Sequence, residues 1–279
     1  MTQLASHLVR LKNRLESTSD TPGLDAQVLL AHILGVGRAW VLGHPEAELD
    51  EHQERALEGA LLRLAAGQPL PYVLGEWEFF GLSFALTPQV LIPRPETEQL
   101  VELALAWLNE NPDRRQVVDV GTGSGCIAIT LAVNVPDLQV TAVDCSLEVL
   151  QVARNNAHRH EVEKRVRLVQ SDLMNMLQGS FDLICANLPY IPTATLQNLA
   201  VYQREPTLAL DGGLRGLDLI ERLLKQSPSR LARGGLLLLE IEASQGSDAH
   251  ALAGEVFPDA EVQVLADLAG HDRVVRIKT

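Results

Sequence analysis

The 279-residue sequence predicts an α/β protein in which a small all-helical domain precedes a doubly wound parallel sheet. Two observations lead to this prediction. Apolar residues recur at helical spacing as far as residue 75, and short apolar runs alternate with helical segments from residue 116 onward. With 46% hydrophobic residues, a chain of this length can bury a core in each part.

The first 75 residues are predicted to form an N-terminal helical domain. The leucines from Leu4 to Leu15 recur at helical spacing, and the segments 24–34 and 50–66 are also rich in apolar residues. Gly67 and Pro69 end the last of these segments. Since no strand-like alternation occurs before residue 76, we expect four or five helices.

In the stretch "EWEFFGLSFAL", residues 76–86, the helical spacing of apolar residues ends. Two short aromatic runs flank Gly81, which predicts a β-hairpin. We expect residues 76–92 to link the helical domain to a second domain spanning residues 93–279. That domain opens with a helix, because Pro95 suits a first turn and Glu96 and Glu98 suit the positive end of the helix dipole.

Strand, loop and helix alternate in the rest of the chain. We predict strands at 117–120, 138–143, 166–170, 181–186 and 236–241, with helices at 126–133, 147–158 and 217–231. Strands joined through helices form parallel sheets. Two more strands, at 262–265 and 273–277, lack a long helix between them and should pair antiparallel at the sheet edge.

Composition excludes several classes of function. A net charge of −13 disfavours a large nucleic-acid footprint, so no stable nucleic-acid partner is expected. Three cysteines without a CxxC pair, and histidines without ligand spacing, predict a reduced cytoplasmic protein with no metal site. No apolar run is long enough to cross a bilayer, and the N-terminus lacks the features of a signal peptide.

A glycine-rich loop follows the first predicted strand in "VVDVGTGSGCIAI". Such loops allow a ligand to approach the backbone closely at a helix N-terminus. Cys126 stands where the dinucleotide fingerprint has its last glycine, and no P-loop lysine is near, so both of those readings fit poorly. The pattern Asp-x-Gly-x-Gly-x-Gly is similar to the first motif of S-adenosylmethionine-dependent methyltransferases. A tight turn without a ligand is the alternative.

Acidic residues follow the next two strands. Asp144 ends the second strand, where a carboxylate can accept hydrogen bonds from both ribose hydroxyls. Asp172 follows the third strand, where it can accept from an adenine amino group while Leu173 packs on the base. Helix capping for Asp144 and a turn for Asp172 remain alternatives. The carboxyl ends of parallel strands meet at one edge of a sheet, so these residues should lie together.

The fourth strand ends in Asn187-Leu188-Pro189-Tyr190. This tetrapeptide resembles the Asn/Asp-Pro-Pro-Tyr/Phe/Trp signature of amino-directed methyltransferases, with Leu188 in place of the usual first proline. An amide nitrogen is a poor nucleophile. The Asn187 side-chain oxygen and the Leu188 carbonyl can each accept one N–H of such a nitrogen, and Tyr190 can stack on a planar group. An Asn-x-Pro turn that simply ends the strand is the alternative.

Six segments occur in one order: "GQPLPYVLGEWEFFGLSF", "LIPRPETE", "DVGTGSGCIAI", "ANLPYIP", "EPTLALDGGLRGLD" and "LAGHDRVVRIK". Together they resemble the HemK/PrmC family, the peptide chain release factor glutamine methyltransferases. The resemblance implies a seven-stranded class I methyltransferase (Rossmann-like) domain after a substrate-recognition domain of helices. It also implies methyl transfer from S-adenosyl-L-methionine to the glutamine of the Gly-Gly-Gln motif in class I peptide chain release factors.

The resemblance also implies roles for individual residues. The cofactor site should comprise Gly121, Thr122, Gly123, Ser124, Gly125, Asp144, Asp172, Leu173 and Asn187. The segment Asn187–Tyr190 should hold the glutamine and carry catalysis. Arg94 and Glu98 belong to a stretch that forms part of the pocket wall in the family, with helix-start capping and packing as the alternative.

Two other functions use the same motifs. A nucleic-acid methyltransferase acting on the amino group of adenine or guanine would hold a flipped base by the same Asn-x-Pro-Tyr logic. The acidic net charge and the absence of an evident basic, aromatic-rich recognition domain disfavour it. A binding protein without catalysis is disfavoured because Asn187 and the glycines are intact.

Overall fold

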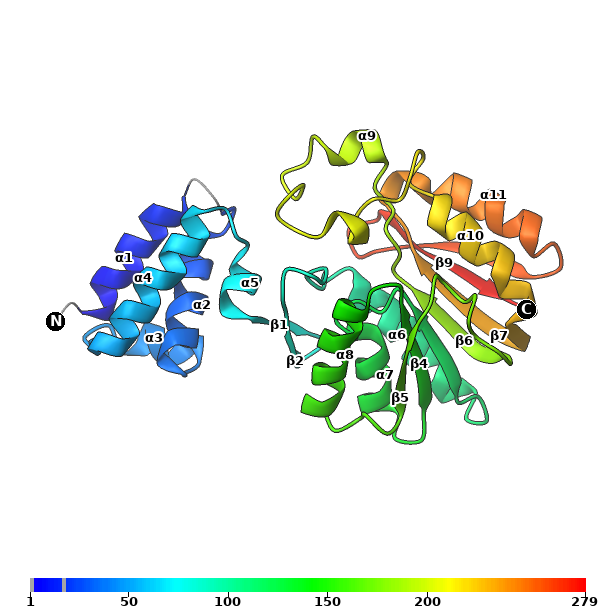
Figure 1. The fold of residues 1–279 in the computed structure, drawn as a ribbon, viewed down its shortest axis with the longest axis horizontal. Coiled ribbons are helices and arrows are strands. Elements are labelled where there is room, and N and C mark those ends of the chain that lie inside the picture. The colour runs from blue at the N-terminus through cyan, green and yellow to red at the C-terminus, as the bar shows by residue number, and fades with distance from the viewer. Residues whose placement is uncertain (1–2, 17–18) are drawn as a thin grey trace. The chain divides into compact units, whose positions relative to one another are not determined.

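The computed structural model describes residues 3–16 and 19–279. The chain divides into two compact units, Met1–Glu76 and Trp77–Thr279, which we describe separately (Figure 1). Among the described helices, none combines the length and the apolar character that crossing a bilayer requires.

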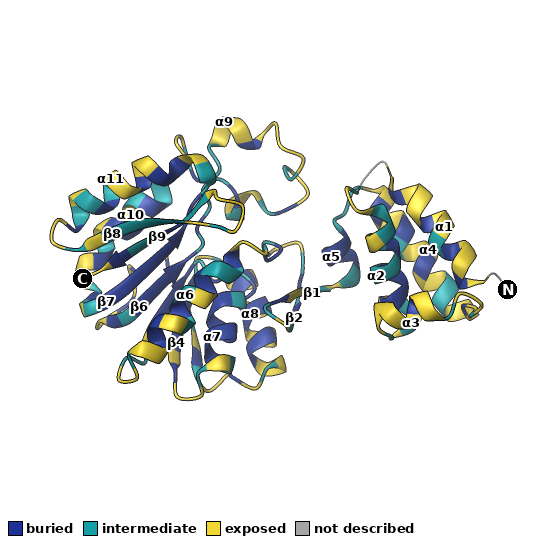
Figure 2. Ribbon diagram, turned by 180° about the vertical axis from the view of Figure 1, so that it is seen from behind, coloured by how far each residue is buried: buried dark blue, intermediate teal, exposed yellow. Residues whose placement is uncertain are grey.

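The first unit is all helical, as predicted. Its described residues form α1 (Leu4–Leu15), α2 (Pro22–Leu34), α3 (Arg38–Gly43), α4 (Glu51–Ala65) and α5 (Leu70–Leu74). Leu4, Leu11 and Leu30 are fully buried between the helices, so the leucine periodicity marks the core of this unit (Figure 2).

The predicted hairpin is present as β1 (Glu76–Phe79) and β2 (Leu82–Ala85). Its two-residue turn places Phe80 and Gly81 at φ values of 52° and 73°, which is the conformation that suits tight hairpins. The hairpin is bonded to the second unit, because Asn156 exchanges two hydrogen bonds with the Ala85 backbone. The linking role of residues 76–92 stays a prediction.

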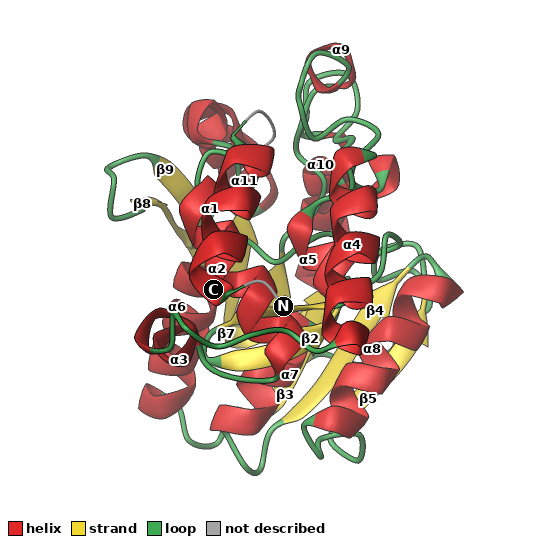
Figure 3. Ribbon diagram, turned by 90° about the vertical axis from the view of Figure 1, so that its left-hand side faces the viewer, coloured by secondary structure: helices red, strands yellow, loops and turns green. Residues whose placement is uncertain are grey.

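The second unit is built on a seven-stranded sheet with the strand order β5-β4-β3-β6-β7-β9-β8. Figure 3 shows its strands in yellow among the helices. Its strands are β3 (Gln116–Val120), β4 (Gln139–Asp144), β5 (Val166–Gln170), β6 (Phe181–Ala186), β7 (Leu231–Glu240), β8 (Glu261–Ala266) and β9 (Asp272–Lys278). The first five pair in parallel, while β9 pairs antiparallel with β7 and β8. The predicted fold class and edge pairing are confirmed.

Helices cover both faces of the sheet, because side chains alternate between the faces along each strand. Val117 and Leu183 pack in one core with α6 (Thr97–Glu110), α7 (Cys126–Asn134) and α8 (Leu147–Arg159). Their neighbours Val118 and Ile184 pack in the other core with α10 (Asp218–Gln226) and α11 (Gly246–Val256). Figure 1 shows α10 and α11 on one side of the sheet and α6, α7 and α8 on the other.

Two predicted boundaries were wrong, and one helix was missed. The helix expected at 217–231 ends at Gln226, because Pro228 follows within a 3-10 turn, and Leu231 already belongs to β7. The helix after Pro95 begins only at Thr97. Helix α11 was not predicted, since its small residues, alanine and glycine, give a weak apolar pattern.

Candidate active site

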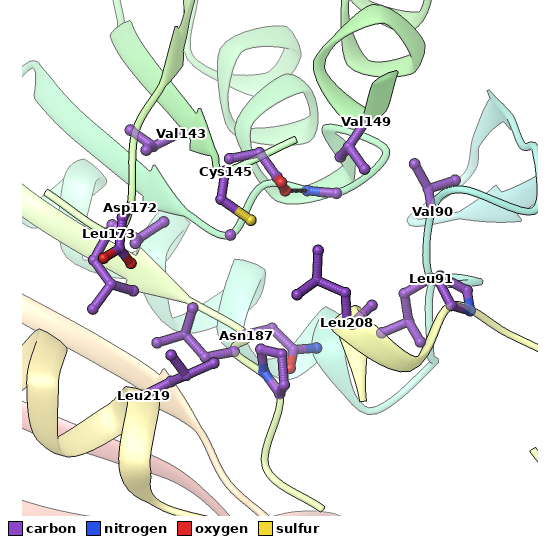
Figure 4. Close-up of a pocket in the computed structure, with 18 of the residues that line it drawn as sticks. Val90, Leu91, Val143, Cys145, Val149, Asp172, Leu173, Asn187, Leu208 and Leu219 are labelled. Atoms are coloured by element: carbon purple, nitrogen blue, oxygen red, sulfur yellow. Dashed lines mark hydrogen bonds between the residues drawn. The ribbon is translucent and has the colours of Figure 1, made fainter. Parts of the chain in front are cut away.

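The predicted site residues gather at the carboxyl edge of the sheet. Strands β3, β4, β5 and β6 are parallel neighbours, so the loops that follow them open on the same side. A cavity of about 270 Å³ lies there. The predicted residues that line it are Gly121, Gly123, Asp144, Asp172, Leu173, Asn187, Leu188 and Pro189. In Figure 4, Asp172 and Leu173 lie at one end and Val90 and Leu91 at the other.

The glycine loop presents bare backbone to this cavity. The amides of Gly121 and Thr122 both donate to the Val143 carbonyl, at 2.9 and 2.8 Å, which holds the loop against β4. Gly121 has a φ of 77°, and a Cβ there would lie 2.9 Å from the side chain of Leu188. Gly123, at a φ of 57°, has no neighbouring atom within 4 Å of such a Cβ, so its backbone is open to a ligand.

Asp119, the first residue of the glycine pattern, holds the loop in place by hydrogen bonds. It is fully buried, and its Oδ2 accepts hydrogen bonds from the Thr122 hydroxyl at 2.6 Å and the Ala128 amide at 3.2 Å. Burial raises its pKa to about 7, against the effect of these two donors. Sequence reasoning assigned no role to Asp119, although its place at the head of the pattern was a usable signal.

Three predicted cofactor residues of the loop do not line the cavity. Thr122 and Ser124 are buried, with the Thr122 hydroxyl turned to Asp119 and the Ser124 carbonyl bonded to Asn156. Gly125 is the N-cap residue of α7, and a Cβ there would lie 2.7 Å from Ile129. The structure therefore gives these residues a role in shaping the loop, and their contact with a cofactor is not favoured.

Asp144 is half-buried at the end of β4 and lines the cavity. Its Oδ1 accepts from the Ser146 amide at 3.0 Å, and its Oδ2 accepts from the Gly123 amide at 3.2 Å. Burial raises the pKa of this carboxyl, and these backbone donors oppose the rise. Because a carboxylate oxygen can accept more than one hydrogen bond, both oxygens remain able to accept from a ligand.

Asp172 and Leu173 follow β5 as predicted. Leu173 is buried at a φ of 50°, an uncommon conformation for leucine, and its side chain forms part of the cavity wall. Asp172 is exposed and forms an ion pair with Arg222 of α10 at 2.5 Å. Arg222 also lines the cavity and was not predicted, since it lies 50 residues away in sequence.

A smaller cavity of about 90 Å³ adjoins the first and shares Asn187, Leu188 and Pro189 with it. Tyr190 and Arg94 also line the smaller cavity. Arg94 pairs with the buried Glu205 at 2.5 Å, and the other oxygen of Glu205 accepts from the Ile92 amide at 3.1 Å. This ion pair ties the segment before α6 to the loop after β6.

Glu98 lines neither cavity. Its Oε1 accepts from the Phe80 amide at 2.8 Å, which ties the start of α6 to the hairpin turn. The packing alternative describes Glu98 better than a place in the pocket wall.

Two oxygens at the wall between the cavities are free to accept hydrogen bonds. Asn187 donates its side-chain amide to the Thr97 hydroxyl at 2.9 Å, which leaves its Oδ1 unused. Among residues 3–16 and 19–279, none donates to that Oδ1 or to the Leu188 carbonyl. Leu188 itself is buried, and its side chain packs over the glycine loop at Gly121. Replacing proline by leucine therefore keeps the carbonyl available.

Thr97 and Glu240 contact two residues of this wall, Asn187 and Tyr190 respectively. Neither contact was predicted. Both residues are almost fully buried. The Tyr190 hydroxyl lies 3.4 Å from Glu240 Oε1, and the Tyr190 carbonyl accepts from the Gln245 side chain at 2.8 Å. Burial raises the pKa of the Tyr190 hydroxyl, so it stays protonated at neutral pH. A glutamate ending the apolar run "LLLLE" at the carboxyl edge was the signal in the sequence.

Known proteins resemble this chain in sequence and in fold. Residues 7–75 match the PrmC N-terminal domain, and residues 98–204 match the methyltransferase small domain. The release factor glutamine methyltransferase of Koribacter versatilis is 40% identical over 270 residues, covering 95% of this chain and 94% of the relative. That of Moorella thermoacetica is 43% identical over 256 residues, covering 91% and 90%.

A 16S rRNA methyltransferase from T. Thermophilus, solved in complex with AdoMet and guanosine, shares the fold with a TM-score of 0.53. It is 18% identical, and the match covers 73% of this chain and 49% of that one. Identity at the level of the two curated relatives, over nearly the whole length of both partners, goes beyond a shared fold. The chain therefore belongs to the release factor glutamine methyltransferase family.

Proposed function

We propose that this protein transfers a methyl group from S-adenosyl-L-methionine to the side-chain amide nitrogen of a glutamine, the one in the Gly-Gly-Gln motif of class I peptide chain release factors. One observation of the site carries the proposal. The Asn187 Oδ1 and the Leu188 carbonyl are two free acceptors at a wall shared by two cavities. A primary amide offers two N–H groups, which match this pair.

The larger cavity fits the cofactor. S-adenosylmethionine, when bound, supplies an electrophilic methyl group on a positively charged sulfur. The loop around Gly121 and Gly123 would let the cofactor lie against bare backbone, and Asp144 would accept from its ribose hydroxyls. Leu173 would pack on the adenine, with Asp172 accepting from the exocyclic amine. The acidic groups also favour a cationic ligand.

The smaller cavity would hold the acceptor amide. The lone pair of an amide nitrogen is delocalised, so holding both N–H groups on acceptor oxygens favours its localisation for attack. Pro189 restricts the backbone and has no N–H to compete for these acceptors. Tyr190 forms a flat wall against which the amide plane can lie. No strong base is needed, because the nitrogen becomes acidic once it is alkylated.

The helical unit would recognise the protein partner, a class I release factor. The family-model match over residues 7–75 supports that role. The net charge of −13 disfavours a stable nucleic-acid partner. Since release factors work in translation, we place the reaction in the cytoplasm.

The experiment that tests the function is an incubation of the purified chain with labelled S-adenosylmethionine and a class I release factor, followed by peptide mapping. We expect one methyl group on the glutamine of the Gly-Gly-Gln motif. The matched control is a release factor with that glutamine replaced by asparagine, which should take up no label. Label transferred instead to tRNA, ribosomal RNA or DNA would contradict the proposal and identify a base-directed enzyme.

A further inference from the structure

The chain between β6 and α10 contains a segment, residues 192–210, that leaves the sheet and returns to the same point. At its two ends the Ile191 amide donates to the Leu210 carbonyl at 3.0 Å, and the Gly212 amide donates to the Ile191 carbonyl at 2.8 Å. The short helix α9 (Thr193–Leu196) and the turns after it form a long loop at the end of the sheet (Figure 1). We call residues 192–210 the strap.

The strap contributes to the lining of both cavities. In the larger cavity its lining residues are Pro206, Leu208 and Ala209, and in the smaller cavity they are Val201, Ala209 and Leu210. The rest of the smaller cavity is lined by residues 187–191, which include the two free acceptors, and by Leu91 and Arg94. A displacement of the strap would therefore change the space in which the acceptor amide is held.

Glu205 ties the strap to the segment before α6. Its side chain is 6% exposed, and its Oε1 accepts from Arg94 Nη2 at 2.5 Å. Its Oε2 accepts from the Ile92 amide at 3.1 Å. These donors lie 111 and 113 positions away in sequence. Because a buried carboxylate without partners is costly, these bonds favour the closed position of the strap.

The other hydrogen bonds of the strap are local. Among the residues that the structure describes, those of 193–209 otherwise bond only within residues 192–213, as in the bond from the Thr193 hydroxyl to Asp211 Oδ1 at 2.7 Å. Such bonds fix the shape of the strap but do not hold it against the segment before α6. The ion pair and the Ile92 amide supply that attachment.

We propose that Arg94 and Glu205 are positioning residues for the transfer. Their ion pair holds the strap in place as a wall of the smaller cavity, so that an amide bound to Asn187 and Leu188 is kept in line with the methyl group. This inference rests on the proposed methyl transfer to a glutamine amide. It gives Arg94 a role in the cavity wall, with no bond to the reacting atoms.

The first test removes the ion pair from either side. Arg94→Met keeps an unbranched side chain without the charge, and Glu205→Gln keeps the shape of the carboxylate. We expect kcat for release-factor methylation to fall about 10- to 100-fold in each variant, the effect of misplacing a reacting group by about 1 Å. The affinity for S-adenosylhomocysteine, measured by calorimetry, should fall much less, because the glycine loop and Asp144 are unchanged.

The double variant separates positioning from direct contact with the substrate. If the two residues act through their bond, the double variant should be no poorer than Arg94→Met alone, which leaves a buried carboxylate without its cation. Losses of kcat that multiply in the double variant would mean that each residue acts by itself. That result would overturn the proposal.

Arg114→Met is the matched control. Arg114 is 33% exposed, against 35% for Arg94, and it pairs with Asp182 at 2.9 Å. Asp182 also accepts from backbone amides, those of Arg115 and Gln116. This ion pair lies where β3 and β6 begin, at the opposite edge of the sheet from the cavities. Its loss should lower the free energy of unfolding without changing kcat.

Trypsin provides a readout without substrate. Arg204 is an exposed residue of the strap, next to Glu205, so the rate of cleavage after Arg204 reports how often the strap opens. The exposed Arg215 lies outside the strap and gives the reference rate. Relative to it, we expect cleavage after Arg204 to be about tenfold faster in Arg94→Met, which leaves the cleaved bond unchanged, than in wild type or Arg114→Met.

These measurements separate this inference from the proposed function. If the wild type fails to methylate release factor but Arg94→Met speeds cleavage after Arg204, only the function fails. If the wild type methylates release factor and Arg94→Met matches Arg114→Met in kcat or in cleavage after Arg204, only the positioning role fails.

Discussion

The larger and the smaller cavity of the second unit are built in different ways. The larger cavity, proposed for the cofactor, lies at the loops that follow neighbouring parallel strands, and its Asp144 is held by the backbone amides of Ser146 and Gly123, 2 and 21 residues away. Its Asp172 is the exception, since the Arg222 side chain pairs with it from 50 residues away. The acceptor cavity is held by side chains that bridge distant segments, including Thr97 with Asn187 and Arg94 with Glu205. The larger cavity therefore depends mainly on short motifs at strand ends, and the smaller cavity depends on tertiary packing.

This difference predicts which substitutions should affect cofactor binding and which should affect turnover. A backbone-lined loop keeps its geometry as long as its glycines remain, so single side-chain changes there should affect binding more than turnover. The wall between the cavities, which carries the acceptor oxygens of Asn187 and Leu188, depends on several long-range contacts at once. We therefore expect substitutions in this acceptor wall to affect turnover while the cofactor still binds. The predictions below test this division, from the largest expected effect to the smallest.

The largest effect is expected for Asn187→Ala. This change removes one of the two free acceptors, so kcat should fall by about 10²- to 10³-fold, as for the loss of one oxyanion-hole donor. The affinity for S-adenosylhomocysteine, measured by calorimetry, should stay within a few-fold of wild type. Complete loss of cofactor affinity would contradict the division between the cavities.

Gly216→Ala should disturb the acceptor wall by displacing the backbone of Tyr190. Gly216 has a φ of 76°, and a Cβ there would lie 2.2 Å from the Tyr190 carbonyl and 2.5 Å from the Gln245 side chain. Strain and overpacking should together lower the free energy of unfolding by about 2–4 kcal/mol and reduce kcat. Denaturant unfolding and initial rates measure the two effects.

Gly179→Ala is the control for this prediction. Gly179 has a similar φ of 81°, but no atom lies within 4 Å of its Cβ position. It should lose about 1 kcal/mol from backbone strain and keep its kcat. Equal losses of kcat in the two variants would show that the contact with Tyr190 does not position the acceptor wall.

Asp144→Ala should act on the cofactor cavity alone. Loss of charged hydrogen bonds should weaken cofactor binding by about 1.5–3 kcal/mol, while kcat at saturating cofactor changes little. Asp259→Ala, an exposed carboxylate at the other edge of the sheet, is the control for the change in net charge. An unchanged dissociation constant for Asp144→Ala would remove its ribose role.

The smallest effect is expected for Asp172→Asn. Asp172 is exposed and already paired with Arg222, so its contribution to cofactor binding should be about 1 kcal/mol or less. Titration of the variant with S-adenosylhomocysteine checks this value. A loss as large as that of Asp144→Ala would mean that the two acids contribute equally, against the present ranking.

The same division explains what could be predicted from the sequence. Local patterns of clear period or spacing in contiguous residues predict four features: the parallel sheet, the glycine loop, Asp144 and the Asn187–Tyr190 segment. The contacts of Thr97 with Asn187 and of Arg222 with Asp172 could not be predicted, because pairing between segments 50 to 90 residues apart leaves no local pattern. Glu240 had a local signal at the end of its apolar run, but nothing in the sequence indicated its partner Tyr190. Helix α11 was missed for a different reason, its weak apolar periodicity.

The most direct test of the account is a crystal structure of the chain with S-adenosylhomocysteine and a peptide that carries the target glutamine. The account predicts that the Asn187 Oδ1 and the Leu188 carbonyl both accept hydrogen bonds from the same side-chain nitrogen of that glutamine. A glutamine nitrogen bound elsewhere, or an Asn187 amide turned with its Nδ2 toward the substrate, would contradict it.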